Sequence, residues 1–404
     1  MSPTTLLAAI VFALTYLVLG VGALPPLRLD RTGAALVGAT LMVAIGAVSA
    51  TDAARAIDVG TLALLFGMMI VAAHLRLAGF FGWCARRVLG LTRSPAALLV
   101  LTTWLSGVLS ALFVNDTVCV LLTPLVIELA ATASLPPVPF LLAVAMGANA
   151  GSVATIVGNP QNMMIASLGQ IGYAPFAAAL VPVALGALAI TSAALVLAYA
   201  RTLPRTIAVL QPAERSRVHR PLLTKTLVVA ALLLAAMLAG VAPPLAAMGA
   251  AAVLLITRRV RPGRVHALID WSLLAMFAGL FVVVAAVEHT GLAARMLATL
   301  ESVLHGPHAF VALTALLSNL VSNVPAVMLL GTAASQASDP LHARLLLAMA
   351  STLAGNLTLV GSVANLIVVA QAAPRARVGF WEYARVGAPV TLLSLVWGVL
   401  WLGA

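Results

Sequence analysis

Two short polar stretches interrupt long apolar runs, at residues 110–117 (SALFVNDT) and 318–325 (SNLVSNVP). The first contains Asp116, the only charged side chain between Arg93 and Glu128. A carboxylate in the middle of a membrane segment costs roughly 2.5–3.5 kcal/mol on insertion scales, and such residues usually serve an ion or proton pathway. We therefore interpret the two stretches as the tips of paired re-entrant hairpins that form a transport site.

Two further stretches, residues 147–162 and 351–365, place glycines, asparagines and hydroxyl residues inside runs long enough for a membrane helix. Non-helical backbone at membrane depth is tolerated only where protein covers it or where it lines a cavity. Pro160 prevents a regular helix, because it lacks an N–H donor and clashes with the preceding turn. A helix broken there exposes N–H groups with partial positive charge and carbonyl oxygens that can hold a cation. We predict one broken helix at each stretch.

The four stretches together supply the candidate substrate- and ion-binding residues. Asparagine amides both donate and accept hydrogen bonds, so they can face an oxyanion, a neutral hydroxide or the shell of a cation. The alternative is that these residues only satisfy backbone groups at the helix breaks or link helices to one another. The first half-site comprises Asn115, Asp116, Thr117, Asn149, Ser152, Thr155, Asn159 and Asn162, and the second comprises Ser322, Asn323, Asn356, Thr358, Ser362 and Asn365.

Asp116 is the residue that we expect to couple transport to an ion gradient. Away from their ends, the apolar segments contain no Arg or Lys. A fully charged di- or tricarboxylate would therefore meet only helix termini, hydroxyls, amides and any co-bound cation, and Asp116 would repel it unless protonated or neutralised by Na⁺. This pattern favours H⁺ or Na⁺ as the coupling ion, with Asp116 as the titrating group or cation ligand. We predict no other cofactor and no resident metal.

The composition is that of a membrane protein, because 63% of the 404 residues are hydrophobic and only 8% are charged. That length allows about ten membrane helices of ~20 residues each. We find no nucleophile–base arrangement and no Walker motif, so we do not expect an enzyme, nor a nucleic-acid partner. The expected spans are 4–24, 33–50, 59–78, 138–168, 174–200, 226–242, 244–257, 271–288, 341–372 and 386–403, and the hairpins are 95–131 and 307–336.

The distribution of basic residues predicts the orientation. If the N-terminus lies outside, 19 of the 22 basic residues fall in cytoplasmic loops, and the outside keeps Arg55, Arg295 and Arg344. An excess of basic residues on the cytoplasmic side is the usual determinant of orientation. We therefore expect a multi-pass protein of the cell (inner) membrane, in contact with its lipids, with both termini outside.

The two halves of the chain resemble each other. Each half contains five spans and one hairpin, so the second half enters the membrane upside down, as in the inverted repeats of secondary transporters. We place the first repeat at residues 1–200, a basic cytoplasmic connector at 201–225 and the second repeat at 226–404. The matching pairs are GALPPL at 22–27 with GVAPPL at 240–245, Asp58 with Asp270, Gly67 with Gly279, Asn115 with Asn323, Gly151 with Gly355, Gly158 with Gly361 and Asn162 with Asn365.

Several of these motifs resemble the ion-transporter superfamily, which includes arsenite/antimonite permeases, sodium/proton antiporters, citrate permeases and divalent anion/sodium symporters. They are NDTVCVLLTP at residues 115–124, GNPQN at 158–162, SNVPAVMLL at 322–330 and DRTGAALVGA at 30–39. The resemblance implies a scaffold and a mobile transport domain, elevator-like motion and a dimer. In the symporters both tips read Ser-Asn-Thr, whereas Val324 and Pro325 stand after Asn323 here, which resembles the arsenite-permease and antiporter branch more closely.

The sequence thus favours an ion-coupled secondary transporter of small anions or oxyanions, similar to an arsenite permease. A sodium/proton antiporter and a citrate-type carboxylate transporter remain alternatives, and a channel is a third class. An arsenite-type permease could work with a separate ATPase subunit, of which the sequence itself gives no sign.

Overall fold

The structure is a computed structural model that describes residues 2–24, 28–207, 218–292, 306–373 and 375–403. Most of the connector, residues 208–217, lies outside the described part. Within the described residues the only strands are β1 (Ala23–Leu24) and β2 (Leu29–Asp30), which pair antiparallel. The rest of the regular structure is helical, which makes the fold all-α.

The first half of the chain runs from α1 to α10. Its hairpin is made by α6 and α7, and its broken helix by α8 and α9 with a short 3₁₀ turn, η2, between them. The bounds are α1 Pro3–Val21, α2 Arg31–Ala44, α3 Ala50–Ala56, α4 Val59–Leu77, α5 Phe80–Leu89, α6 Pro95–Leu112, α7 Asn115–Thr132, α8 Pro137–Ser152, η2 Ile156–Gly158, α9 Pro160–Gly169 and α10 Tyr173–Tyr199.

The second half runs from α11 to α20 and repeats this order. Its hairpin is made by α16 and α17, and its broken helix by α18 and α19 around η3. The bounds are α11 Arg220–Leu238, α12 Pro243–Leu255, α13 Pro262–His266, α14 Trp271–His289, α16 Pro307–Val321, α17 Asn323–Gln336, α18 Pro340–Ala354, η3 Leu359–Gly361, α19 Val363–Ala372 and α20 Phe380–Leu402.

Eight of the described helices are at least 18 residues long and apolar enough to cross a membrane. They are α1, α4, α6, α7, α10, α11, α14 and α20, and the shorter apolar helices are α2, α8, α12, α16 and α19. With each broken helix counted as one crossing, these helices correspond to the predicted spans and hairpins. The predicted fold class, a polytopic all-α membrane protein with inverted repeats, is confirmed.

Two local differences from the predicted spans have clear causes. The span expected at 33–50 is shorter, because Gly46 adopts φ +71° and ends α2, after which the separate helix α3 forms. The helix α5 was not anticipated. It is amphipathic: Phe81 and Cys84 are buried while Arg87 on the same helix is exposed, so its apolar positions are too few to resemble a span.

The inverted repeat is visible in how the first helices of each half pack. α2 packs against α14 of the other half, and α12 packs against α4. A side chain at Gly279 would meet Ala35 of α2, and one at Gly67 would meet Ala247 of α12. Ala35 and Ala247 hold the same place in the two halves, as do Gly67 and Gly279. The reciprocal contact fixes the register between the halves independently of the loops.

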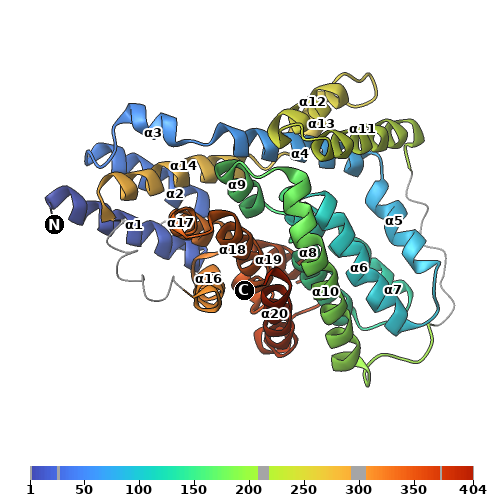
Figure 1. Cartoon of the computed structure of the whole chain (residues 1–404). Coiled ribbons are helices and arrows are strands. Elements are labelled where there is room, and N and C mark those ends of the chain that lie inside the picture. The colour runs from blue at the N-terminus through green and yellow to red at the C-terminus, as the bar shows by residue number, and fades with distance from the viewer. Residues whose placement is uncertain (1, 25–27, 208–217, 293–305, 374, 404) are drawn as a thin grey trace.

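The helices separate into two groups (Figure 1). α1, α2, α4, α11, α12 and α14 form a group that we call the scaffold layer, and α2, α4, α11, α12 and α14 lie along the upper part of the view. The hairpins, the broken helices, α10 and α20 form the second group, which we call the hairpin layer.

Helix α8 forms the centre of the hairpin layer and is buried along almost its whole length. Its Gly147 lies so close to α6 that a side chain there would stand 2.6 Å from the carbonyl oxygen of Thr103. Gly151 similarly faces Gly107. Small residues four apart let two membrane helices approach closely, so this contact holds the first hairpin firmly against the broken helix.

Candidate functional site

The first hairpin tip is a short break between two helices. α6 ends at Leu112, Phe113 and Val114 are extended, and α7 begins at Asn115. The Asn115 side chain accepts a hydrogen bond from the backbone N–H of Asp116 at 2.9 Å. It also donates to Asn149 Oδ1 at 3.2 Å, which ties the tip to α8. Asn115 therefore orders the start of α7, including the backbone that carries the Asp116 side chain.

The second hairpin tip reverses at Ser322, which adopts φ +77°. A side chain in that region is strained, and such strain tends to occur at functional sites. The Asn323 amide nitrogen, turned to satisfy its neighbours, donates to Ser318 Oγ at 2.6 Å and to the carbonyl oxygens of Ser351 and Gly361, each at 3.2 Å. Its oxygen accepts from Gln161 Nε2 at 3.3 Å. The second tip is thus bonded to both broken helices.

In each broken helix, one asparagine side chain bonds to the carbonyl oxygens at the break. Asn162 Nδ2 donates to the carbonyl oxygens of Ser152 at 3.1 Å and Thr155 at 3.0 Å. Asn365 Nδ2 donates to those of Gly355 at 2.7 Å and Thr358 at 3.1 Å. Because these bonds correspond pairwise, Gly355 matches Ser152 and not Gly151, which moves the predicted pairing by one residue. Each asparagine satisfies carbonyls that a regular helix would have bonded.

The half-helices that follow the breaks are capped by side chains. Asn159 Oδ1 accepts from the backbone N–H of Asn162 at 2.8 Å at the start of α9. Ser362 Oγ accepts from the backbone N–H of Ala364 at 3.3 Å at the start of α19. The remaining free N–H groups at these starts carry the partial positive charge of a helix N-terminus.

Asn149 joins the two halves at their centre. Its Nδ2 donates to Asn356 Oδ1 and to Asn365 Oδ1, each at 3.0 Å. Its Oδ1 accepts from Asn115 Nδ2 and from Ser362 Oγ, each at 3.2 Å. The side chain is fully buried, so all of these bonds are made away from water.

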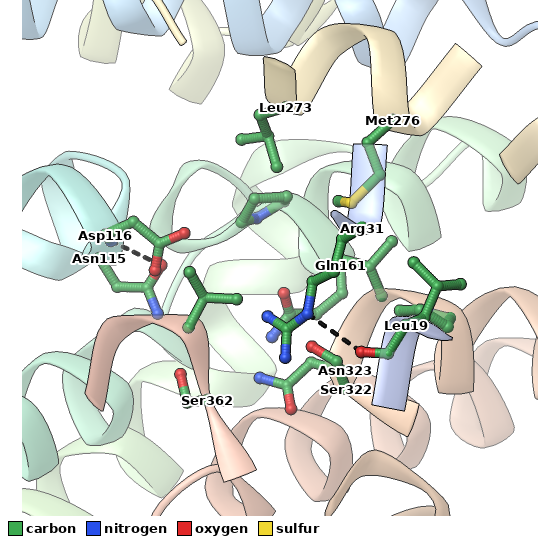
Figure 2. Close-up of a pocket in the computed structure, with 14 residues that line it drawn as sticks. Leu19, Arg31, Asn115, Asp116, Gln161, Leu273, Met276, Ser322, Asn323 and Ser362 are labelled. Atoms are coloured by element: carbon green, nitrogen blue, oxygen red, sulfur yellow. Dashed lines mark hydrogen bonds between the residues drawn. The ribbon is translucent and has the colours of Figure 1, made fainter. Parts of the chain in front are cut away.

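A small cavity of about 50 Å³ lies where the two tips meet the scaffold layer (Figure 2). Its apolar wall includes Leu19 of α1 and Met276 of α14, and its polar wall comes from the tips and the half-helix starts. The lining residues are Leu19, Arg31, Asn115, Asp116, Pro160, Gln161, Leu273, Met276, Ser322, Asn323, Val324, Pro325, Ser362 and Val363.

Two opposite charges line this cavity. Arg31 is the first residue of α2, and its Nε donates to the carbonyl oxygen of Leu19 at 3.0 Å. Asp116 lies on the other side of the cavity, and the pair makes no ion pair within 4.0 Å in the described part of the chain. Asp270 caps α14, where its Oδ1 accepts from the backbone N–H of Leu273 at 2.9 Å. The cavity therefore has the Arg31 guanidinium on one side and the Asp116 carboxyl group on the other.

The 14 candidate residues divide between the cavity and its support. Asn115, Asp116, Ser322, Asn323 and Ser362 line the cavity. Most of the others make the internal hydrogen bonds described above, and Thr358 Oγ1 bonds to Asn319 Oδ1 at 3.1 Å. Which residues touch a substrate stays a prediction. The nine that do not line the cavity are Thr117, Asn149, Ser152, Thr155, Asn159, Asn162, Asn356, Thr358 and Asn365.

Two polar cavity residues, Gln161 and Arg31, were not among the candidates. Gln161 follows the helix-breaking Pro160, and its Nε2 donates to Thr352 Oγ1 at 3.2 Å, so its place in the GNPQN motif was the available signal. Arg31 was assigned to a cytoplasmic loop, but in the structure it lines the same cavity as Asn115 and Asp116. Asp30 caps α2 directly before Arg31, and the bond from Arg31 Nε to the carbonyl oxygen of Leu19 holds the guanidinium at the cavity.

Comparison with known proteins gives consistent results. Residues 7–344 match the family described as citrate transporter. The chain is 31% identical to the silicon efflux transporter LSI3 of rice, over 99% of this chain and 98% of that protein. It is 26% identical to the putative transporter arsB of Dictyostelium discoideum, over 92% of this chain and 87% of that protein.

A solved structure shares the fold. The YdaH transporter of Alcanivorax borkumensis, described as having an unusual topology, aligns with a TM-score of 0.58 over 99% of this chain and 98% of that chain. The two sequences are 17% identical, so this similarity concerns the fold alone.

Proposed function

The chain belongs to the citrate transporter family and is a multi-pass membrane transporter, and on that premise we propose that it carries small anions or oxyanions by ion-coupled secondary transport. One observation carries this proposal: Arg31 and Asp116 face the same small cavity, where the two hairpin tips meet the scaffold layer. A guanidinium is the side chain best suited to an oxyanion, and an intramembrane carboxylate is suited to a coupling ion.

The size of the cavity favours a small solute. Its volume of about 50 Å³ accommodates only a few heavy atoms, since one water needs roughly 10–15 Å³ by the same measure. Names of relatives point the same way, because one is a silicon efflux transporter and another a putative arsB transporter. We therefore prefer an inorganic oxyanion, or its neutral hydroxide, to a citrate-type carboxylate, although Arg31 would suit one carboxylate group.

Asp116 is our candidate for the coupling residue. It lies at the first hairpin tip, and the second tip has Val324 in the corresponding position. A single carboxylate can bind H⁺ or Na⁺ when the substrate is present and release it on the other side. The Arg31 charge on the same cavity disfavours a pure sodium/proton antiporter, because it would repel a bound Na⁺.

Elevator-like movement of the hairpin layer against the scaffold layer is the motion that we propose. The tips and broken helices are bonded to one another through Asn149, Asn323 and Gln161. Between the layers, the side-chain hydrogen bonds in the described part are Tyr16 to the carbonyl of Pro325 and Thr332 to Glu288. A layer bonded mainly within itself can move as one body.

The proposed orientation, with both termini outside the inner membrane, puts the cavity near the cytoplasmic side. The end of α1 and the starts of α2 and α14 would then be cytoplasmic, and each contributes lining residues. The structure would accordingly have its site facing the cytoplasm.

Counterflow in proteoliposomes tests the function. Proteoliposomes that contain the purified protein would be loaded with arsenite, silicate, phosphate, sulfate or citrate. Exchange of the loaded anion would then be measured with and without a pH or Na⁺ gradient. We expect saturable exchange of a small oxyanion, driven uphill by one of the gradients. Proton movement that depends on Na⁺ with no anion present would instead support the antiporter, and flux that does not saturate would support a channel.

A further inference from the structure

The Arg31 side chain has unused hydrogen-bonding capacity that faces the cavity. Its Nε bonds to the carbonyl oxygen of Leu19 at 3.0 Å, and this is its only side-chain hydrogen bond in the described part of the chain. No carboxylate there lies within ion-pair distance of it. A guanidinium carries several further N–H donors in a planar fork that fits an oxyanion. Figure 2 shows this fork among Gln161, Ser322 and Asn323.

Arg31 belongs to the scaffold layer, whereas most polar groups of the cavity belong to the hairpin layer. It begins α2, which packs against α14. Asn115, Asp116, Asn323 and Ser362 come from the hairpins and the second broken helix. If the hairpin layer moves, these groups therefore move together and leave Arg31 behind.

The other end of the scaffold layer has no equivalent arginine. The paired contacts of Gly279 with Ala35 and of Gly67 with Ala247 show that α2 and α12 are in register. In this register the first residue of α12, Pro243, takes the place of Arg31. The two ends of the scaffold layer thus differ at this position, where one end has the guanidinium of Arg31 and the other has Pro243.

A second cavity marks this other end. It has a volume of about 430 Å³, and Asp58, Gly240 and Pro243 line it. In the repeat these residues correspond to Asp270, Gly22 and Arg31, of which Arg31 lines the first cavity. No Arg or Lys lines this second cavity in the described part of the chain. Asp58 is engaged in capping α4, where its two oxygens accept from Gly60 N–H at 3.0 Å and Thr61 Oγ1 at 2.6 Å.

We propose that Arg31 is an anion-binding residue that contacts the substrate only while the site faces the cytoplasm. The proposal rests on the transport function and layer movement proposed above. Its consequence is an asymmetric carrier, in which a small oxyanion binds more tightly from the cytoplasmic side than from outside. A fixed arginine at one end of the path would then favour loading from the cytoplasm.

Vesicles of opposite orientation test the proposal. Inside-out vesicles present the cytoplasmic face and right-side-out vesicles the external face, and exchange of arsenite, silicate, phosphate and sulfate is measured in both. In Arg31→Gln we expect the half-saturating concentration at the cytoplasmic face to rise by about tenfold, since a hydrogen bond to a charged group is lost. The external value should stay unchanged, and Arg31→Lys should lie between Gln and wild type.

Two further variants complete the design. Arg28→Gln removes an exposed charge three residues earlier and should leave both faces as in wild type. Pro243→Arg adds a guanidinium at the matching external position and should lower the external half-saturating concentration, which also gives a result if Arg31→Gln does not fold. Equal values for Arg31→Gln and wild type at the cytoplasmic face, or an equal rise at both faces, would overturn the role of Arg31. If wild type exchanges none of the anions, the proposed function itself fails.

Discussion

Tyr16 of α1 donates a hydrogen bond from its hydroxyl to the carbonyl oxygen of Pro325 at the second hairpin tip, at 3.2 Å. The two residues belong to different layers, so this bond joins the scaffold to the part that we propose to move. Its donor is deeply buried, and Pro325 also lines the cavity. The contact therefore favours the arrangement seen in this structure over any in which the tip has left α1.

Removing that hydroxyl should shift the balance between arrangements without unfolding the protein. We expect Tyr16→Phe to destabilise this arrangement relative to the others by only about 1 kcal/mol, because one neutral hydrogen bond is lost. Labelling of a cysteine placed in the second cavity, at Gln170, should become faster. Tyr383→Phe is the matched control, since the Tyr383 hydroxyl is buried without a hydrogen-bond partner in the described part. Equal labelling in both variants would show that the Tyr16 bond does not select a state.

Asn149 provides a second prediction, which concerns stability. Asn149→Ala would leave buried polar atoms of Asn115, Asn356, Asn365 and Ser362 without this partner. Each buried group left unsatisfied costs about 1–3 kcal/mol, so a large fall in the thermal unfolding temperature is expected. Thr40→Ala is the control, because that exposed hydroxyl donates to the carbonyl oxygen of Leu36 in its own helix. A melting temperature for Asn149→Ala close to that of wild type would contradict the central role of this side chain.

Much of the fold could be predicted from the sequence because membrane helices leave a strong signal. Long apolar runs, the placement of basic residues and the repeated motifs sufficed for the spans, the hairpins and the broken helices. The helix α5 was missed because an amphipathic helix with Arg86 and Arg87 does not resemble a span. The shorter α2 depends on the backbone conformation of Gly46, which the apolar pattern does not reveal.

The site could be predicted only in part, because residue type does not distinguish binding from support. Asn115 and Asn162 are both asparagines in polar motifs. Yet one lines the cavity, and the other satisfies the carbonyls of a helix break. Arg31 looked like an ordinary loop charge, since its position depends on how α1 and α2 are joined. Only the three-dimensional arrangement brings it opposite Asp116.

The close contacts of Gly67 and Gly279 give a third prediction. A Cβ atom at Gly67 would lie 2.7 Å from the carbonyl carbon of Ala247, and one at Gly279 would lie 2.8 Å from that of Ala35. Because backbone must move in either case, we expect Gly67→Ala and Gly279→Ala to destabilise the protein by about 1–3 kcal/mol each. Gly249→Ala, in α12, has open space around it and should be neutral or slightly stabilising in a thermal melt. If all three variants melted alike, the proposed register of the scaffold helices would be incorrect.

Asp116→Asn gives the last prediction, which separates coupling from binding. Asparagine keeps the size and can still hydrogen bond, but it cannot take up and release a proton or neutralise Na⁺. We therefore expect exchange of substrate between equal pools to persist, while a pH or Na⁺ gradient no longer drives uptake uphill. The control is Asp339→Asn, because Asp339 is an exposed cap of α18 and asparagine caps helices equally well. Gradient-driven uptake by Asp116→Asn at the wild-type level, with unchanged pH dependence, would remove Asp116 from the coupling step and direct attention to the helix termini at Asn115 and Ser362.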